Sequence, residues 1–364
     1  MARKSTQATH WSAPKARAKI DDVAREAGVS SATVSRVLNH PAVVRPELRD
    51  KVARAITKLS YTRDSAGRAL KSGRMRIIGA VVPTLGLSIF AEGIEAMQNR
   101  LSEAGYTLLI GNAQYDQQRE LQELRSLLER GVDGLALVGG SHNPELRSLV
   151  QQAGVPVITT YVSKASNGMP AIGIDNEAAT RELTRYLISI GHKSFGAIAN
   201  LPPSNDRSRA RLAGIQKTLA QARIELKPTQ IIKADHSLAQ GRSAFRQLMI
   251  DHPEITAVIC TNDTLAIGAM AEARKLGFRV PEALSIAGFD DIELAAQVDP
   301  PLTTVGVPAG EIGRGAADYL INAISGLSVP RNIQLPYRII MRGSTGPAPS
   351  LSRKKSKTAA VRKR

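Results

Sequence analysis

Short apolar runs alternate with helix-length amphipathic segments in the body of the chain, and this alternation limits the fold more than any other feature. The run IIGAVVP (77–83) is apolar on both faces of the expected strand, which is typical of a parallel strand covered by helices on both sides. The segment FAEGIEAMQNRLSEAGY (90–106) then has helical spacing, and TLLIGNAQ (107–114) returns to strand character. This repeated order predicts right-handed βαβ units around a parallel sheet.

A second round of the same alternation begins at Asp175. It contains the strand-like runs SFGAIAN (194–200), ITAVICTND (255–263) and ALSIAGFDD (283–291), with helix-length segments between them. Two rounds in one chain predict an α/β body, residues 76–346, of two doubly wound lobes with a cleft between them. We place the first lobe at about 76–172 with a return segment near 305–335, and the second lobe at about 175–303.

Residues 19–61 predict a compact all-α unit of three helices. The segments are IDDVAREAG (20–28), SSATVSRVLN (30–39) and RPELRDKVARAITKLSY (45–61). Gly28 is expected to end the first helix, and Ser30 is expected to cap the second. Two helices joined by a tight glycine turn form the helix-turn-helix motif, whose second helix lies in the major groove of DNA.

The second of these helices has a free face of small and polar residues opposite its apolar side. Arg36 can form the bidentate contact to guanine, and the small residues Ser31 and Ala32 let the backbone approach the base edges. Flanking side chains of suitable size to bind phosphates are Ser30, Thr33 and Asn39. A helical hairpin in a protein core would show the same glycine turn, so the basic surroundings and the N-terminal position favour DNA binding.

The formal net charge of +17 is concentrated at the two ends of the chain. Residues 1–76 carry 17 Lys and Arg against 6 Asp and Glu, a net charge of +11, and residues 347–364 carry 7 against none. The remaining 25 basic and 26 acidic residues leave the middle of the chain at −1. A basic end on a neutral body indicates a polyanionic partner, although solvated charge runs would give the same count. We expect residues 1–18 and 347–364 to be disordered basic segments.

Several classes of protein lack support in the sequence. Cys260 is the single cysteine and follows an apolar run, so we expect a buried thiol, no intrachain disulfide and no zinc site or other metal. No secretory signal or membrane-spanning run is visible, which predicts a cytoplasmic protein without a membrane partner. An α/β enzyme and a solute-binding protein remain alternatives for the body. We expect no enzymatic activity and no cofactor, because a G-x-G-x-x-G after the first strand, a P-loop and a Ser/His/Asp motif are all absent.

The chain resembles the lactose/galactose repressor (LacI/GalR) family over about residues 19–345. The motifs stand in family order and include DVAREAGVSSATVSRVLN, AGRALKSG, GIDNEAAT, CTNDTLAIGAM and IAGFDDIELAAQVDPPLTTV. The resemblance implies a helix-turn-helix headpiece (19–61), a hinge helix within 62–75 and a body like the periplasmic sugar-binding proteins. It also implies a homodimeric transcription regulator, usually a repressor, that binds a pseudo-palindromic operator in double-stranded DNA under control of a small effector.

The same resemblance assigns Leu70 as the hinge residue that enters the minor groove. An apolar wedge at this position would unstack one base step and bend the duplex. Arg63 replaces the proline that the family usually has after the headpiece, and Gly67 costs about 1 kcal/mol relative to alanine inside the hinge helix. We therefore expect the hinge helix to depend on contact with the operator.

The resemblance also implies an effector site between the lobes. Positions that match hydrogen-bonding residues of the family are Arg211, Asn262 and Asp290, and positions that match the walls of its site are Phe90 and His236. Tyr161 stands where the family often has an acid. Together with the basic segment NDRSRARLAG (205–214), this replacement favours an anionic effector such as a sugar acid over a neutral sugar. Helix N-caps at Asp263 and Asp291, and a loop position for His236, are the alternatives.

Overall fold

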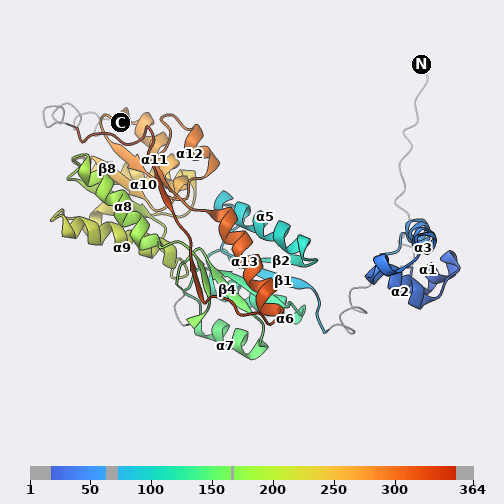
Figure 1. The fold of residues 1–364 in the computed structure, drawn as a ribbon. Helices are drawn as coiled ribbons and strands as arrows, with labels where there is room; N and C mark the ends of the chain where they lie inside the picture. Colours follow the sequence, from blue (N-terminus) through green and yellow to red (C-terminus); the bar gives the residue numbers. More distant parts are fainter. Residues whose placement is uncertain (1–17, 63–72, 165–167, 350–364) are drawn as a thin grey trace, which may run out of the picture. The chain divides into compact units, whose positions relative to one another are not determined.

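The structure is a computed structural model that describes residues 18–62, 73–164 and 168–349. The chain divides into two compact units, of which the first ends at Met75 and the second begins at Arg76 (Figure 1). The sequence predicted an N-terminal extension (1–18), a hinge linker (62–75) and a C-terminal tail (347–364). Of these, residues 1–17, 63–72 and 350–364 lie outside the described residues, and so does Leu70.

The described part of the first unit consists of short helices. They are α1 (Ile20–Ala27), α2 (Ser31–Asn39), the 3-10 helix η1 (Pro41–Val43) and α3 (Pro46–Leu59). Gly28 ends α1 at a φ of 65°, a left-handed conformation that suits glycine, and the Ser30 side chain accepts a hydrogen bond from the Thr33 N–H. The predicted end of α1 and the predicted cap of α2 are therefore confirmed.

One apolar cluster joins the three α-helices of the first unit. Val23 of α1, Val34 of α2 and Val52 of α3 are all fully buried in this cluster. Because Val34 faces the core, the opposite side of α2 is the side that solvent reaches, and Ala32 and Arg36 are exposed there. The packing thus leaves the predicted DNA-contacting face of α2 free.

The first lobe of the second unit is built around a six-stranded parallel sheet with the order β11-β5-β4-β3-β1-β2. Its strands are β1 (Ile77–Val82), β2 (Thr107–Asn112), β3 (Gly134–Val138), β4 (Val157–Thr160), β5 (Ala171–Gly173) and β11 (Asn332–Gln334). Its helices are α5 (Ser88–Glu103), α6 (Gln117–Glu129), α7 (Pro144–Ala153) and α13 (Ala309–Ile324). The predicted doubly wound α/β arrangement is confirmed.

Helices cover both faces of this sheet, as the apolar strand sequences require. Ile78 and Val82 of β1 belong to one buried cluster with residues of α5 and α13, whereas Val81 belongs to another with Leu124 of α6. Alternate strand residues point to opposite faces of a sheet, so both faces need an apolar cover. Figure 1 shows α5 beside α13, which comes from the distant return segment of the chain.

The second lobe has a four-stranded parallel sheet with the order β7-β6-β8-β9. Its strands are β6 (Phe195–Ala199), β7 (Ile231–Lys233), β8 (Ala257–Cys260) and β9 (Ser285–Ala287). Its helices are α8 (Asn176–Ser189), α9 (Asp206–Gln221), η3 (Pro228–Gln230), α10 (Leu238–Asp251), α11 (Asp263–Lys275) and α12 (Glu293–Gln297). Residues of α8 and α9 pack in one buried cluster, and residues of α10 and α11 pack in another.

The chain returns to the second lobe at its end. β10 (Thr304–Gly306) and β12 (Arg338–Ile340) form an antiparallel pair, and Gly306 bridges to Asp290. Ser344 Oγ then donates to the Ile286 carbonyl at 2.6 Å. The sequence predicted a second lobe that ends near residue 303, and this prediction leaves out the final segment. Strands of three residues give little apolar pattern from which to predict them.

Three expectations from composition can be compared with the described residues. Cys260 is fully buried in β8, which confirms its interpretation as a small core residue. Within residues 18–62, 73–164 and 168–349, no helix is long and apolar enough to span a membrane. No cluster of His, Cys, Asp and Glu suited to a metal ion occurs in the same part of the chain.

Candidate functional site

The structure places most of the predicted DNA-contacting residues on accessible positions of α2. Ala32, Arg36 and Asn39 are exposed, as is Ser30 at the N-cap, while Ser31 and Thr33 are half-buried. Four of these residues also have partners within the headpiece: Ser31 Oγ lies 2.6 Å from Asp21 Oδ1, Asn39 Nδ2 donates to Ser35 Oγ, and Thr33 Oγ1 lies 2.9 Å from Ser30 Oγ.

A pocket lies where the carboxyl ends of the strands of both lobes meet. In doubly wound sheets ligands bind at these ends, because the loops that follow the strands converge there. The first lobe contributes residues at the start of α5 and after β2 and β4, namely Leu87, Ile89, Phe90, Tyr115 and Tyr161. The second lobe contributes residues after β6, β7, β8 and β9, namely Asn205, Arg207, Ser208, Arg211, His236, Thr261, Asn262 and Asp290.

Arg211 and Asp290 form a buried ion pair at the centre of the second-lobe wall. Arg211 Nη1 lies 3.1 Å from Asp290 Oδ1, and each side chain is 9% exposed. The same guanidinium donates to Asn176 Oδ1 and to the Thr261 carbonyl, and it stacks on the Phe289 ring with its carbon 3.6 Å from the ring centroid. Burial raises the pKa of Asp290 to about 6, and Arg211 acts in the opposite direction. The arginine is therefore fixed in position and orients the carboxylate.

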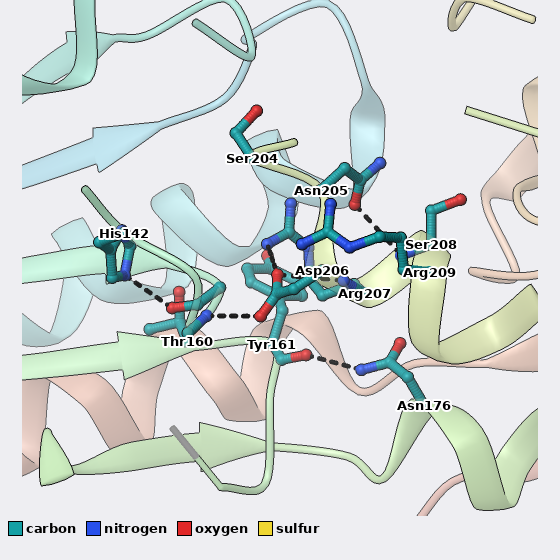
Figure 2. A network of polar contacts seen from close by, with 12 residues as sticks. His142, Thr160, Tyr161, Asn176, Ser204, Asn205, Asp206, Arg207, Ser208 and Arg209 are labelled. Atoms are coloured by element: carbon teal, nitrogen blue, oxygen red, sulfur yellow. Dashed lines mark hydrogen bonds and ion pairs between the residues drawn. The ribbon is translucent and has the colours of Figure 1, made fainter. Parts of the chain in front are cut away.

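Arg207 stands at the junction of the two lobes (Figure 2). Its Nη1 lies 3.1 Å from Asp206 Oδ1, while Asp206 Oδ2 accepts a hydrogen bond from the Gly140 N–H of the first lobe at 2.7 Å. A second contact between the lobes is the hydrogen bond from Ser204 Oγ to the Tyr115 carbonyl at 2.5 Å. The start of α9 thus connects the pocket to the opposite lobe.

His236 is held as a neutral ring between an amide and an aromatic side chain. The Asn262 carbonyl oxygen caps α11 by accepting from the Leu265 N–H, so its amide nitrogen is left to donate to His236 Nδ1. The Tyr115 ring lies 4.9 Å from the His236 ring, centroid to centroid, at an angle of 32°. Burial, followed by the charges of Arg211 and Arg207, lowers the pKa of His236 to about 3.

The first-lobe wall is aromatic. Phe90 and Tyr161 meet edge to face with ring centroids 5.2 Å apart, and the Tyr161 hydroxyl donates to the Ile89 carbonyl at 2.8 Å. Burial raises the pKa of Tyr161 and raises that of Tyr115 to about 12, so both phenols keep their protons.

Strained backbone marks the same pocket. Tyr115, Tyr161 and Asp290 have φ angles of 59°, 64° and 119°, values that L residues other than glycine rarely adopt. Such strain costs free energy and tends to persist at binding sites, where the surrounding structure fixes it. Three such residues around one pocket support a binding role for it.

All six residues that the sequence assigned to an effector site line this one pocket: Phe90, Tyr161, Arg211, His236, Asn262 and Asp290. The expected N-cap role is wrong for Asp263 and Asp291, since Asn262 caps α11 and Ile292 stands at the N-cap of α12. Asp263 is instead buried, where it accepts from the Thr304 hydroxyl and the Ile292 N–H. The pocket lining also includes residues that the sequence did not indicate, namely Leu87, Ile89, Tyr115, Asn205, Ser208 and Thr261.

Comparison with known proteins gives matches to both units. Residues 19–64 match the model of bacterial regulatory proteins of the lacI family, and residues 75–343 match the model of periplasmic binding proteins and the sugar-binding domain of the LacI family. The chain is 34% identical over 334 residues to the HTH-type transcriptional repressor CytR of Escherichia coli K12, an alignment that covers 91% of this chain and 97% of CytR.

Two solved structures extend the comparison. The transcription regulator GntR from Chromobacterium violaceum is 33% identical with a TM-score of 0.71, and the match covers 74% of this chain and 99% of GntR. The lac repressor dimer bound to operator and the anti-inducer ONPF is 28% identical with a TM-score of 0.80, over 91% of this chain and 100% of the repressor. These relatives are regulators and not enzymes. Since the family models cover both the headpiece and the body, the chain belongs to the LacI family of bacterial transcription regulators.

Proposed function

We propose that this protein is a homodimeric repressor whose affinity for a pseudo-palindromic operator is controlled by a small sugar-like effector, a sugar or a sugar acid, bound between the lobes. The observation that carries the proposal is the convergence of polar and aromatic side chains from both lobes on one pocket. Support comes from the similar lac repressor, which was solved as a dimer with operator and an anti-inducer.

On the DNA side, the headpiece supplies one recognition helix for each half-site. Arg36 contacts guanine in the major groove, and Ser31 and Ala32 lie against the neighbouring base edges. Residues that bind the phosphates and fix the position of the helix are Ser30, Thr33 and Asn39. Leu70 of the hinge enters the minor groove.

On the effector side, the two walls have different tasks. Arg211, Asn262 and Asp290 donate hydrogen bonds to hydroxyl groups of the ligand or accept them, since these groups are fixed by their own buried partners. Phe90, Tyr161 and His236 cover the apolar faces of a sugar ring. An effector that contacts both walls is bound more tightly when the lobes are closed.

Lobe closure then transmits the presence of the effector to the DNA. The contacts from Asp206 to Gly140 and from Ser204 to Tyr115 join the lobes next to the ligand. A ligand shifts a two-state equilibrium only by the difference between its affinities for the two states. In a dimer, a change in closure alters the separation of the two hinge segments and so the fit to two half-sites.

The test is a fluorescence-anisotropy titration on the DNA upstream of the gene and its neighbours, with and without a panel of sugars and sugar acids. We expect tight, salt-sensitive binding that one compound abolishes or makes possible. Arg36→Met should weaken binding to the selected operator by about 5- to 150-fold, whereas Arg274→Met, the same change at an exposed position of α11, should not. Weak binding that depends neither on the DNA sequence nor on any compound would contradict the proposal.

A further inference from the structure

The Arg207 guanidinium is buried in the pocket but only partly satisfied. Its side chain is 4% exposed and its Nη1 is paired with Asp206, yet its Nη2 is buried and forms no hydrogen bond of good geometry, although the Tyr115 hydroxyl is close enough to interact with the guanidinium. A buried N–H of a charged group without an acceptor is unfavourable, and native structures rarely retain one. An acceptor supplied by a ligand would remove this cost.

The chemistry of the Arg207 guanidinium favours a negatively charged acceptor. The groups that line the pocket include two guanidiniums, Arg207 and Arg211, and one carboxylate, Asp290. Asp206 is already committed, with one oxygen on Arg207 and the other on the Gly140 N–H. The neutral ring of His236 adds no charge. Asp206 and Asp290 balance the charges of the two guanidiniums, so the preference for an anion rests on the N–H groups of Arg207 Nη2. Arginine binds carboxylate and phosphate groups especially well.

We propose that the effector carries an anionic group, a carboxylate or a phosphate, which accepts a hydrogen bond from Arg207 Nη2. The hydroxylated part of the same molecule then lies against Asn262 and Asp290. This inference rests on the proposed function, and it narrows the ligand from sugars in general to sugar acids and sugar phosphates.

Isothermal titration calorimetry with matched pairs of ligands tests the inference on the full chain. The pairs are D-gluconate with D-glucitol, D-glucuronate with D-glucose, and D-glucose 6-phosphate with D-glucose, together with the corresponding galactose compounds. We expect at least one acid to bind about ten-fold or more tightly than its neutral partner. The carboxylate and phosphate arms show which anion is preferred.

Two variants at neighbouring arginines separate the pocket from general electrostatics. Arg207→Met should reduce the preference for the acid to about three-fold or less, with little effect on the neutral partner. Arg209→Met removes the same charge two residues away, where Nη1 donates to the Pro202 and Pro203 carbonyls, and should leave the preference intact. Arg207→Lys, which keeps the charge, should retain part of the preference and provides a second variant if Arg207→Met does not fold.

The outcomes distinguish this inference from the proposed function. Equal or tighter binding of the neutral partners in the unmodified protein would overturn the anionic effector and leave the sugar-like effector in place. An acid preference that survives Arg207→Met would overturn the role of Arg207. Absence of binding by every compound would contradict both the anionic effector and the sugar-like ligand, although operator binding could still be measured by anisotropy.

A separate observation concerns how the headpiece recognises bases. Ser31 Oγ lies 2.6 Å from Asp21 Oδ1, and an ionised carboxylate has no hydrogen to donate. The Ser31 hydroxyl therefore donates its hydrogen to Asp21, and it offers only lone pairs to any further partner. In the major groove the donors are the amino groups of cytosine and adenine, whereas guanine and thymine present acceptors at the corresponding positions.

We infer that Ser31 recognises an amino group of cytosine or adenine, and that Asp21 is the positioning residue that excludes keto oxygens. The inference rests on the proposed role of Ser31 at the base edges. The contact with Asp21 gives Ser31 a specific base preference, because a serine hydroxyl without that contact can both donate and accept hydrogen bonds.

Base analogues in the operator test this second inference. The base pair to change is the one whose recognition is altered by Ser31→Ala. At that pair, replacing cytosine by pyrimidin-2-one, or adenine by purine, deletes only the amino group. We expect this deletion to weaken binding about five-fold or more for the unmodified headpiece, but hardly at all for Ser31→Ala or Asp21→Ala. Asp50→Ala, at an exposed acid of α3, should behave like the unmodified protein. Sensitivity to 7-deazapurines instead, with no effect of the amino group, would overturn the inference.

Discussion

The two lobes give the pocket walls of opposite chemistry. The wall from the first lobe is mostly apolar and aromatic, with Phe90 and Tyr161 packed edge to face. The wall from the second lobe is formed by amide, guanidinium, imidazole and carboxylate groups, among them Arg211, Asn262 and Asp290. The first wall offers a surface that fits many rings, whereas the second offers hydrogen bonds that fit few ligands.

This difference indicates a division of labour. Directed hydrogen bonds on the second lobe select the effector, because unmatched buried polar groups are costly. Under the proposed function, apolar contact between the ligand and the first lobe depends on lobe closure. We therefore propose that the second lobe selects the molecule that binds, and that the first lobe responds to its presence.

Breaking the central ion pair should have the largest effect of the changes considered. Arg211→Ala leaves Asp290 as an unpaired buried carboxylate, which costs about 3–5 kcal/mol of unfolding free energy. The double variant Arg211→Met/Asp290→Leu, which removes both charges, should recover most of that loss. Urea unfolding followed by circular dichroism measures both values.

The exposed pair of Lys217 and Glu177 provides the matched control for this change. Its ammonium lies 2.7 Å from the carboxylate, with the lysine side chain 57% exposed. Lys217→Ala should cost less than about 1 kcal/mol, since water screens exposed ion pairs. A similar cost for Arg211→Ala and Lys217→Ala would show that the polar wall is not strongly coupled.

Asp263, directly behind the polar wall, should make stability depend on pH. Burial, together with the charge of Asp290, raises the pKa of Asp263 to about 7 from an ordinary value of 3.8. The folded chain therefore binds this proton more tightly than the unfolded chain, and the stability that the proton provides is lost as pH rises through 7. Asp263→Asn should gain stability relative to the unmodified protein by about 2 kcal/mol between pH 5 and pH 7.

Urea unfolding of both proteins at several pH values measures that relative gain. Groups common to the two proteins, such as His192, largely cancel when one stability is subtracted from the other. A difference that stays constant from pH 5 to pH 8 would mean that the Asp263 carboxyl titrates normally. In that case the hydrogen bonds from Thr304 and Ile292, rather than burial, determine its charge.

The sequence predicted some features of the lobes and the pocket but not others. The alternation of apolar strands and helices determined the two lobes, and the resemblance to the family indicated residues such as Arg211 and Asn262. It did not indicate Tyr115, which follows β2, or Asn205, which is the N-cap of α9, because neither position stands in a motif that marks the pocket. The orphaned Nη2 of Arg207 is likewise visible only when distances are known.

Tyr161→Phe should have the smallest effect, and it tests whether the first-lobe wall is only a cover. The change removes the hydrogen bond to the Ile89 carbonyl and should cost about 1 kcal/mol of unfolding free energy, while edge-to-face packing with Phe90 remains. Because the hydroxyl already has a protein partner, effector affinity measured by calorimetry should change less than about three-fold. A loss of ten-fold or more would place the hydroxyl on the ligand, and the first lobe would then also select the effector.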